Sequence, residues 1–488
     1  MSPLQHRCCC MRRNDKGRKN RESMKQIGIL GAGRSAGFLV EYLGSYCARV
    51  GRELYVYDLD FHRLQQSFVV NDKTHLVVAD LSNPDVVSDI LRNLDVVVSV
   101  LPPPMHLPVA KLCLEHGCHM FTASYTSEGM LALDAQAKEK GLLFMNELGL
   151  DPGIDHLSAS KLFDHAKSLG LEVVTFESHC GGLVDEACCE NNPWKYKFTW
   201  NPTNVVLAGQ GGSSIWKEEG KVMQLDGHLI FSNAREIEVP GIGVFDVYAN
   251  RNSLTYEKLY GLTGARTLLR GTLRRRYFCA AWDVLVVQGF TDSQRILFDA
   301  SEVGRLMAQV VAVDRDRAIK NSSLMAQLWF EKVTGFKNTD LWIDGLRRSG
   351  VDLTHIEGHL RFLQLELGCP NLVIADKSSA QILEQILLDR WALEANHRDE
   401  VVMVHKLGLQ DSSGAEKHWY SVLKVMGEGG DRTAMAKTVG LPLAMGVETF
   451  LEEGSASRGV CLPFDKSWYA PILEKLEHQG IVFDEHLI

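Results

Sequence analysis

The stretch QIGILGAGRSAG, residues 26–37, decides the fold of this chain. A short β-rich run leads into the spacing G-x-G-x-x-A, and an apolar-periodic segment that predicts a helix follows. In this context Gly31 allows the tight turn, Gly33 lets a phosphate approach the backbone, and Ala36 permits close packing of helix on strand. The free N–H groups and positive dipole end of that helix favour an anion. The motif therefore predicts a dinucleotide at the turn.

Strands and helices continue to alternate as far as residue 150. DVVVSVL, residues 95–101, is almost entirely apolar, as expected for a parallel strand covered on both faces. We expect further strands at 53–58, 74–80, 118–124 and 142–149, with helices between them, including one over 128–141. This alternation predicts an α/β fold with a Rossmann-type, doubly wound parallel sheet.

The pattern changes after Asp151. We expect extended pieces to about residue 290, amphipathic helices over 294–398, a β-hairpin over 401–427, and one long helix or a proline-broken pair over 433–454. No low-complexity linker separates these segments, which predicts an interleaved α/β substrate domain with a helical insertion. The expected parts are a disordered basic tail (1–23), a dinucleotide-binding domain (24–150, completed by about 431–460), a substrate domain (151–293, completed by about 399–430 and 461–488) and the helical insertion (294–398).

Composition excludes several classes of protein. The chain has 488 residues, 45% hydrophobic and 23% charged, with a formal charge of -9, so we expect a globular protein that binds no nucleic acid. No segment has the length and hydrophobicity of a membrane helix, and the tail lacks the apolar region of a secretory signal. We interpret the tail as an extension that precedes a true start at Met24. The twelve cysteines form no CxxC pair, which predicts no metal site and reduced thiols in the cytoplasm.

Asp58, at the end of the second strand, bears on the choice of cofactor. A carboxylate there accepts hydrogen bonds from both ribose hydroxyls and repels a 2′-phosphate. The alternative is an aspartate that only stabilises the turn at the end of the strand. The sequence therefore favours NAD, with NADP as the alternative because Arg34, His62 and Arg63 are nearby cations. Further candidate positions at this edge of the sheet end the third and fourth strands: Asp80, Leu81, Leu101 and Pro102.

A concentration of arginines in a net-acidic chain suggests an anionic substrate. Guanidinium groups bind carboxylates through two parallel hydrogen bonds and keep their charge. A polycarboxylate would use two or three of them; the alternative is a solvated charged face. Asp151, before Pro152, is either a helix cap or a functional carboxylate. The arginines concerned are Arg251, Arg270, Arg274, Arg275 and Arg276.

At these segments the sequence resembles the saccharopine dehydrogenase family, in its glutamate-forming saccharopine reductase branch. The resemblance runs from about residue 25 to the C-terminus. It implies a Rossmann domain, an α/β substrate domain and a helical insertion, usually in a homodimer. It also implies NAD(P)-linked oxidation of saccharopine to L-glutamate and 2-aminoadipate 6-semialdehyde, or the reverse. Because Asp58 favours NAD, which commonly serves oxidative pathways, we expect the direction of lysine degradation. The matching stretches are GAGRSA, DVVVSVLP, TASY, NELGLDPGIDH, CGGL, NNPWKYKFTWNP, NRNS, LLRGTLRR and AMAKTVGLP.

The resemblance also implies roles for individual residues. The candidates for the general base are Asp151, Cys180 and His179, and the sequence does not choose among them. The expected substrate contacts are Arg251, Thr272, Leu273 and Arg274. The expected cofactor contacts are Gly31, Gly33, Arg34, Ser35, Ala36, Asp58, Asp80, Leu81, Val100, Leu101, Pro102 and Ser124.

One departure from the family keeps other functions open. Pro103 follows Leu101-Pro102, where the family often has a tyrosine. This change, together with CGGLVDEACCE in place of the family's proline-rich version, motivates one alternative, a dehydrogenase of a related N-carboxyalkyl amino acid. A further alternative, from another class of protein, is a catalytically silent NAD-binding regulator. In all three cases we expect small-molecule ligands.

Overall fold

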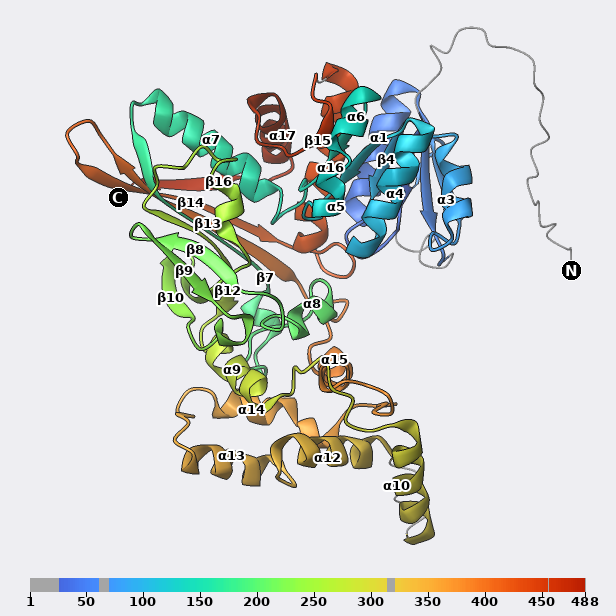
Figure 1. The fold of residues 1–488 in the computed structure, drawn as a ribbon, viewed down its shortest axis with the longest axis vertical. Coiled ribbons are helices and arrows are strands. Elements are labelled where there is room, and N and C mark those ends of the chain that lie inside the picture. Colours follow the sequence, from blue (N-terminus) through green and yellow to red (C-terminus); the bar gives the residue numbers. More distant parts are fainter. Residues whose placement is uncertain (1–25, 61–69, 314–320, 455, 488) are drawn as a thin grey trace, which may run out of the picture.

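A computed structural model describes residues 26–60, 70–313, 321–454 and 456–487. Figure 1 shows an N-terminal α/β part, a second sheet beside it, and a helical part at the far end of the second sheet. The predicted tail (1–23), His62 and Arg63 lie outside the described residues.

The first sheet has seven parallel strands in the order β15-β6-β5-β4-β1-β2-β3. The chain runs from β1 to β3 in one direction and from β4 to β6 in the other, so the strand order reverses between β1 and β4. Ligands of open α/β sheets bind at such a reversal, beyond the carboxyl ends of the strands. The strands are β1 Ile27–Leu30, β2 Leu54–Asp58, β3 Thr74–Val78, β4 Val96–Ser99, β5 His119–Thr122, β6 Leu143–Met145 and β15 Gly459–Cys461.

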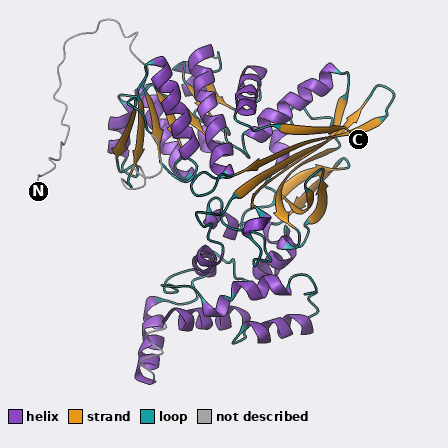
Figure 2. Ribbon diagram, turned by 180° about the vertical axis from the view of Figure 1, so that it is seen from behind, coloured by secondary structure: helices purple, strands orange, loops and turns teal. Residues whose placement is uncertain are grey.

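Helices cover both faces of this sheet (Figure 2). Val96 and Val98 pack into the core shared with α1 and α16, and Val97 packs into the core shared with α3 and α4. Two buried faces explain why β4 is apolar apart from Ser99 at its end. The helices of this part are α1 Gly37–Val50, α3 Pro84–Leu91, α4 Pro103–His116, α5 Glu128–Leu131, α6 Asp134–Glu139, α16 Ala434–Glu453 and α17 Lys466–His478.

The second sheet is mixed, and its main path is β10-β11-β12-β7-β13-β14-β16. Its central pair, β7 and β12, is parallel, and every other pair of described strands is antiparallel. The helix α7, Ile154–Ser168, packs against β7 and β13. The strands are β7 Glu172–Val184, β8 Ser214–Glu218, β9 Lys221–Leu225, β10 Arg235–Val239, β11 Gly243–Ala249, β12 Thr267–Arg275, β13 Asp399–Gln410, β14 Glu416–Met426 and β16 Phe483–Leu487.

The helical part is built around buried tryptophans, among them Trp194, Trp282 and Trp391. Trp194 and Trp391 lie 5.3 Å apart between ring centroids, at an interplanar angle of 65°. The NNPWKYKFTWNP segment therefore belongs to this core and ties it to the second sheet. The helices are α8 Pro202–Val206, α9 Phe278–Gln288, α10 Ala300–Val313, α12 Asn321–Thr334, α13 Thr339–Arg348, α14 Glu357–Leu363 and α15 Ser379–Arg390.

The predicted fold class is confirmed, and the chain returns to both sheets after the helical part. The predicted hairpin corresponds to β13 and β14, and α16 is one helix in spite of Pro442. The predicted boundaries near 150, 293 and 398 fall between elements, whereas 460 falls inside β15.

Two local predictions were wrong. Residues 278–288 form α9 rather than a strand, because a short apolar run buried on all sides carries no periodicity that separates the two. Residues 128–141 hold two short helices, α5 and α6, rather than one.

Candidate active site

A cavity of about 690 Å³ opens beyond the carboxyl ends of β1 and β4, between the glycine turn and the second sheet. Its first wall comes from the Rossmann part and its second wall from β7, β12 and the start of α8. Predicted residues in its lining are Gly33, Arg34, Ser35, Ala36, Val100, Leu101, Pro102, Ser124, Asp151, Cys180, Thr272 and Arg274. It is also lined by residues without a predicted role: Ala123, Leu150, Gly182, Trp200, Asn201, Met435 and Val439.

The glycine turn has the geometry that its sequence predicts. Gly31 has φ +99°, and a Cβ there would lie 3.2 Å from the carbonyl oxygen of Val100. A side chain is therefore disfavoured by both conformation and space. At Gly33 no described atom outside Gly33 and its two chain neighbours lies within 4 Å of the position that a Cβ would take, so the backbone is open to a ligand beside the start of α1.

The other predicted cofactor residues lie along the neighbouring strand ends, outside the cavity lining. Asp58 accepts the Ala32 N–H at Oδ2 (2.6 Å) and the Asp60 N–H at Oδ1 (3.0 Å). Asp80 accepts the N–H and hydroxyl of Ser82, which lower its pKa. Leu81 is buried in the core beneath this edge. Asp58 and Asp80 thus already hold their own turns in place.

A buried histidine, His106, forms a hydrogen bond with the Ser124 hydroxyl. The Ser124 hydroxyl lies 2.8 Å from Nε2 of His106, and Nδ1 of His106 lies 2.9 Å from the Ser99 hydroxyl. Burial lowers the pKa of His106 to about 4, so the ring is neutral at physiological pH. Sequence reasoning missed His106, which lies inside α4 between Met105 and Leu107 and matches no motif.

Arg274 is the most unusual charge in the cavity. The residue is 2% exposed, and its guanidinium lies between the rings of Tyr196, Tyr248 and Phe278. Its hydrogen bonds are weak ones to the Leu273 carbonyl (3.4 Å) and the Tyr248 hydroxyl (3.3 Å), and its Nε has no partner.

No carboxylate among the described residues forms an ion pair with Arg274. Its cross-strand neighbour Asp246 instead accepts the Cys279 N–H at the start of α9. A buried cation without an anion is costly, and this one faces the cavity.

The remaining predicted substrate residues are divided. Thr272 lines the cavity beside Arg274. Leu273 points the other way, into the apolar core on the opposite face of the sheet, because alternate residues of a strand face opposite sides. Arg251 is exposed at the margin, with its guanidinium carbon 4.7 Å from the centre of the Tyr125 ring. The prediction for Leu273 therefore fails on geometry.

Of the three candidates for the general base, two line the cavity. Burial raises the pKa of the Asp151 carboxyl above its usual range, and Arg270 opposes this effect. Burial raises the pKa of the Cys180 thiol well above its usual value, so the thiol stays protonated.

His179 lies on the opposite face of β7 from Cys180, packed against Gly271 and 3.4 Å from Glu177. His179 is excluded from this cavity because alternate residues of a strand face opposite sides of the sheet, as for Leu273.

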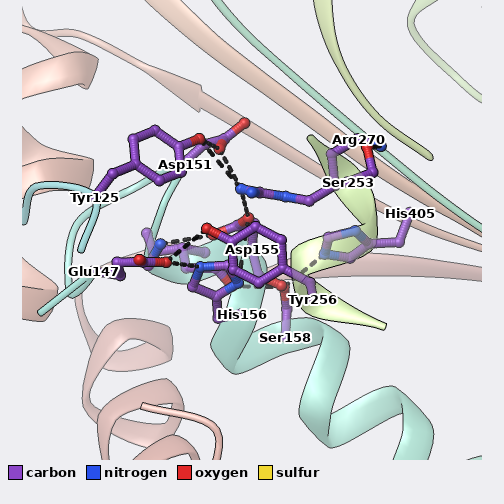
Figure 3. A network of polar contacts seen from close by, with 12 residues as sticks. Tyr125, Glu147, Asp151, Asp155, His156, Ser158, Ser253, Tyr256, Arg270 and His405 are labelled. Carbon is purple, nitrogen blue, oxygen red and sulfur yellow. Dashed lines mark hydrogen bonds and ion pairs between the residues drawn. The ribbon is translucent and has the colours of Figure 1, made fainter. Parts of the chain in front are cut away.

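Asp151 belongs to a buried polar network that sequence reasoning did not assemble (Figure 3). Nη2 of Arg270 donates to Asp151 Oδ1 and to Asp155 Oδ2, each at 2.6 Å. Tyr125 also donates to Asp151 Oδ1, at 2.9 Å. Behind them, Glu147 lies 3.0 Å from Nε2 of His156. The signal was present in NELGLDPGIDH, where Asp151 and Asp155 are four residues apart at the start of a helix.

Comparison with known proteins assigns the whole fold to one family. The model "Saccharopine dehydrogenase NADP binding domain" matches residues 27–145, and "Saccharopine dehydrogenase C-terminal domain" matches 149–481. The chain is 31% identical to the alpha-aminoadipic semialdehyde synthase of Arabidopsis thaliana, over 94% of this chain and 45% of that protein. It is 30% identical to a Pyricularia oryzae saccharopine dehydrogenase (NADP⁺, L-glutamate-forming), over 81% of this chain and 84% of that protein.

The structural comparison agrees. Apo saccharopine dehydrogenase (L-Glu forming) from Saccharomyces cerevisiae superposes with a TM-score of 0.76 at 25% identity, over 95% of this chain and all of that one. The chain spans about half the length of the plant and mammalian relatives. Among the described residues, no helix is long and apolar enough to cross a membrane. On the evidence of fold, cavity and similarity, the chain belongs to the saccharopine dehydrogenase family.

Proposed function

We propose that the chain catalyses the NADP-linked conversion of saccharopine and water to L-glutamate and 2-aminoadipate 6-semialdehyde, or the reverse reduction. The observation that carries this proposal is the buried, uncompensated guanidinium of Arg274 in a cavity that a dinucleotide turn also lines. Saccharopine brings three carboxylates, and one of them would supply the missing anion.

A nicotinamide dinucleotide is the cofactor class that the matched N-terminal domain model describes. The residues fit it: Gly31 and Gly33 leave the backbone approachable, and the 14-residue helix α1 begins at Gly37. The turn and the start of α1 would hold the pyrophosphate. When bound, the oxidised nicotinamide accepts a hydride from the carbon beside the secondary amine of the substrate.

Our choice of NADP over NAD reverses the preference drawn from Asp58. Both carboxylate oxygens of Asp58 already accept backbone N–H groups, which makes a structural role sufficient to explain this residue. Arg34 is exposed and has no ion-pair or hydrogen-bond partner among the described residues, so it is available to a phosphate. The Pyricularia oryzae relative named above is described as an NADP⁺ enzyme.

The side chains that line the cavity would bind the substrate and transfer protons. Arg274 and Thr272 would hold a substrate carboxylate, and the exposed Arg251 would reach a second one at the margin. Hydride loss requires a neutral secondary amine, and the imine that results must be attacked by water. Asp151 would accept the proton in these steps, because its pKa is raised and it lines the cavity. Cys180 would contribute packing, since its thiol stays neutral.

A rate assay tests the proposal directly. Purified protein is mixed with saccharopine and either NADP⁺ or NAD⁺, and the absorbance of the reduced nicotinamide is followed. We expect turnover with both and a higher kcat/KM with NADP⁺, and we expect Arg34→Gln to raise the KM for NADP⁺ more than that for NAD⁺. A flat trace with proven cofactor binding would instead favour a silent regulator.

Pro103 supports a second candidate substrate. It lines the cavity at the start of α4, where it offers no hydroxyl to a substrate. A related N-carboxyalkyl amino acid is therefore the alternative. A higher kcat/KM for such a compound than for saccharopine would favour it.

Assembly and location are also proposals. We infer a homodimer from the family resemblance, and sedimentation equilibrium of the purified chain tests it. We infer a cytoplasmic location because all nine described cysteines are unpaired, as in a reducing compartment; cell fractionation tests this inference.

A further inference from the structure

Arg270 contacts two carboxylates through one nitrogen atom. Its Nη2 lies 2.6 Å from Asp151 Oδ1 and 2.6 Å from Asp155 Oδ2. Dashed lines in Figure 3 mark both contacts. The guanidinium carbon lies 4.4 Å from the centre of the Tyr256 ring and 5.7 Å from that of Tyr125. With 5% exposure and contacts to two aromatic rings, the side chain has little freedom to move.

This contact occupies only one oxygen of Asp151. Oδ1 accepts from Arg270 and from the Tyr125 hydroxyl, whereas Oδ2 has no partner among the described residues. Asp151 lines the cavity, and neither Arg270 nor Asp155 does. Arg270 therefore contacts Asp151 from the side away from the cavity and leaves Oδ2 for a ligand.

The Asp155 carboxylate is held in place by its own contacts, so it can remain beside Arg270 as a second negative charge. It is 1% exposed, its Oδ1 accepts the Gly153 N–H at 2.6 Å, and its Oδ2 lies 3.5 Å from Nδ1 of His156. Burial alone would raise its pKa, but His156, Arg270 and the Gly153 N–H together lower it. The network thus holds one ionised carboxylate behind the arginine and one carboxyl at the cavity.

The groups that face Asp151 come from every element around it. Arg270 is the cation nearest to it, Asp155 is the like charge, and His156 adds a smaller favourable interaction. The neutral groups are the Tyr125 hydroxyl after β5 and the Cys180 thiol on β7. Burial raises the proton affinity of Asp151 most, Arg270 lowers it and Asp155 raises it, so removal of either charge should change that affinity in a direction opposite to removal of the other.

We propose that Arg270 and Asp155 are positioning residues that set the orientation and proton affinity of Asp151. This inference rests on the proposed function, in which Asp151 accepts a proton. Arg270 lowers the affinity and Asp155 restores part of it through the shared nitrogen. The arrangement predicts opposite effects of removing the two charges.

The pH dependence of kcat/KM for saccharopine oxidation tests this prediction. Arg270→Gln should move the acidic limb of the profile to higher pH by about 1–3 units, the range for loss of an adjacent cation. Asp155→Asn should move the acidic limb to lower pH, because Arg270 then forms an ion pair with Asp151 alone. Arg270→Lys should show a smaller shift than Arg270→Gln. Arg276→Gln, which removes an exposed arginine paired with Glu236 just beyond β12, is the matched control and should leave the limb unchanged.

If Arg270 and Asp155 had only a structural role, Arg270→Gln and Asp155→Asn would lower the rate without moving the acidic limb of the pH profile in opposite directions. Equal or same-direction shifts would therefore overturn the inference. Circular dichroism checks folding; if Arg270→Gln fails to fold, Arg270→Lys and Asp155→Asn still give the two opposite shifts.

A second measurement separates this inference from the proposed function. ¹³C NMR of protein labelled at the aspartate carboxyl carbons, with Asp151→Asn for assignment, follows the titration of Asp151 without turnover. We expect the pKa of Asp151 to increase in the order Asp155→Asn, wild type, Arg270→Lys. If the wild type does not turn over saccharopine but this order holds, the proposed function fails and the positioning stands. Any other order overturns the positioning, whatever the activity.

Discussion

Arg270 and Arg274 lie four residues apart on β12, both buried, in contrasting surroundings. Arg270 forms ion pairs with two carboxylates at 2.6 Å, and Arg274 forms none among the described residues. Strand alternation places both on the same face of the second sheet. A buried cation that is paired inside the protein is part of the framework, whereas one that is not paired is costly and is therefore a candidate site for an anionic ligand.

This contrast shows how a candidate binding residue can be recognised: Arg274 is a buried arginine with no ion-pair partner among the described residues. By burial alone the two arginines are alike, at 5% and 2% exposure. By sequence they are both members of LLRGTLRRR. Only the inventory of their contacts distinguishes them, and each prediction below probes that distinction.

The largest expected effect concerns stability. Arg270→Met removes the arginine with which Asp151 and Asp155 both form ion pairs, and we expect it to lower the free energy of unfolding by about 3–5 kcal/mol. Arg274→Met removes an unpaired charge and should be neutral or stabilising without ligand. Urea unfolding of both variants measures the difference, and equal losses would break the comparison.

The pH dependence of that loss is also predicted. Without Arg270, burial raises the folded-state pKa of Asp151 above its unfolded value. The cost is therefore greatest above the folded pKa and is relieved as pH falls and the folded carboxyl takes up a proton. Urea unfolding at pH 8 and at about pH 5 should show a smaller deficit for Arg270→Met at the lower pH.

The next largest effect concerns substrate affinity. Arg274→Gln should raise the KM for saccharopine roughly 10- to 100-fold, since a charge-assisted contact contributes about 1.5–3 kcal/mol. Cofactor affinity, followed by the fluorescence of reduced nicotinamide, should stay unchanged. An unchanged KM would remove Arg274 from the substrate site.

A smaller effect is expected from the group that supports Arg274. The Tyr248 hydroxyl lies 3.3 Å from Nη2 of Arg274. Tyr248→Phe should raise the saccharopine KM about 5-fold, as expected for loss of roughly 1 kcal/mol. Steady-state kinetics measure it, with Arg276→Gln as the control. A greater effect than that of Arg274→Gln would mean that the tyrosine, not the arginine, holds the substrate.

The smallest effect is expected at Cys180, which lies opposite Thr272 in the register of β7 with β12. Arg270 and Arg274 both lower its pKa, but burial outweighs them and the thiol stays neutral. Cys180→Ser should therefore change kcat by no more than about 5-fold, on the scale of one hydrogen bond, and leave the shape of the pH profile intact. Loss of a limb from that profile would assign the thiol a proton-transfer role.

Sequence patterns predicted the Rossmann part well because local rules govern it. The glycine spacing, the apolar β4 and the alternating helices each require one conformation, and together they predicted the cavity wall from Gly33 to Ser124. The same local rules could have excluded one of His179 and Cys180, since neighbours on a strand face opposite sides.

Local patterns could not predict partners brought together from distant segments. Asp155 and Arg270 are separated by 115 residues in the chain and meet at 2.6 Å. The choice of α9 as helix rather than strand depended on burial against the tryptophan core, which no short window contains.

By itself, the sequence determined that a doubly wound sheet with a dinucleotide turn would form, because spacing and periodicity act over a few residues. The tertiary structure alone decided which of two nearby arginines keeps a free charge. That outcome depends on which carboxylates fold against each guanidinium, and in a buried site the nearest opposite charge outweighs every local preference.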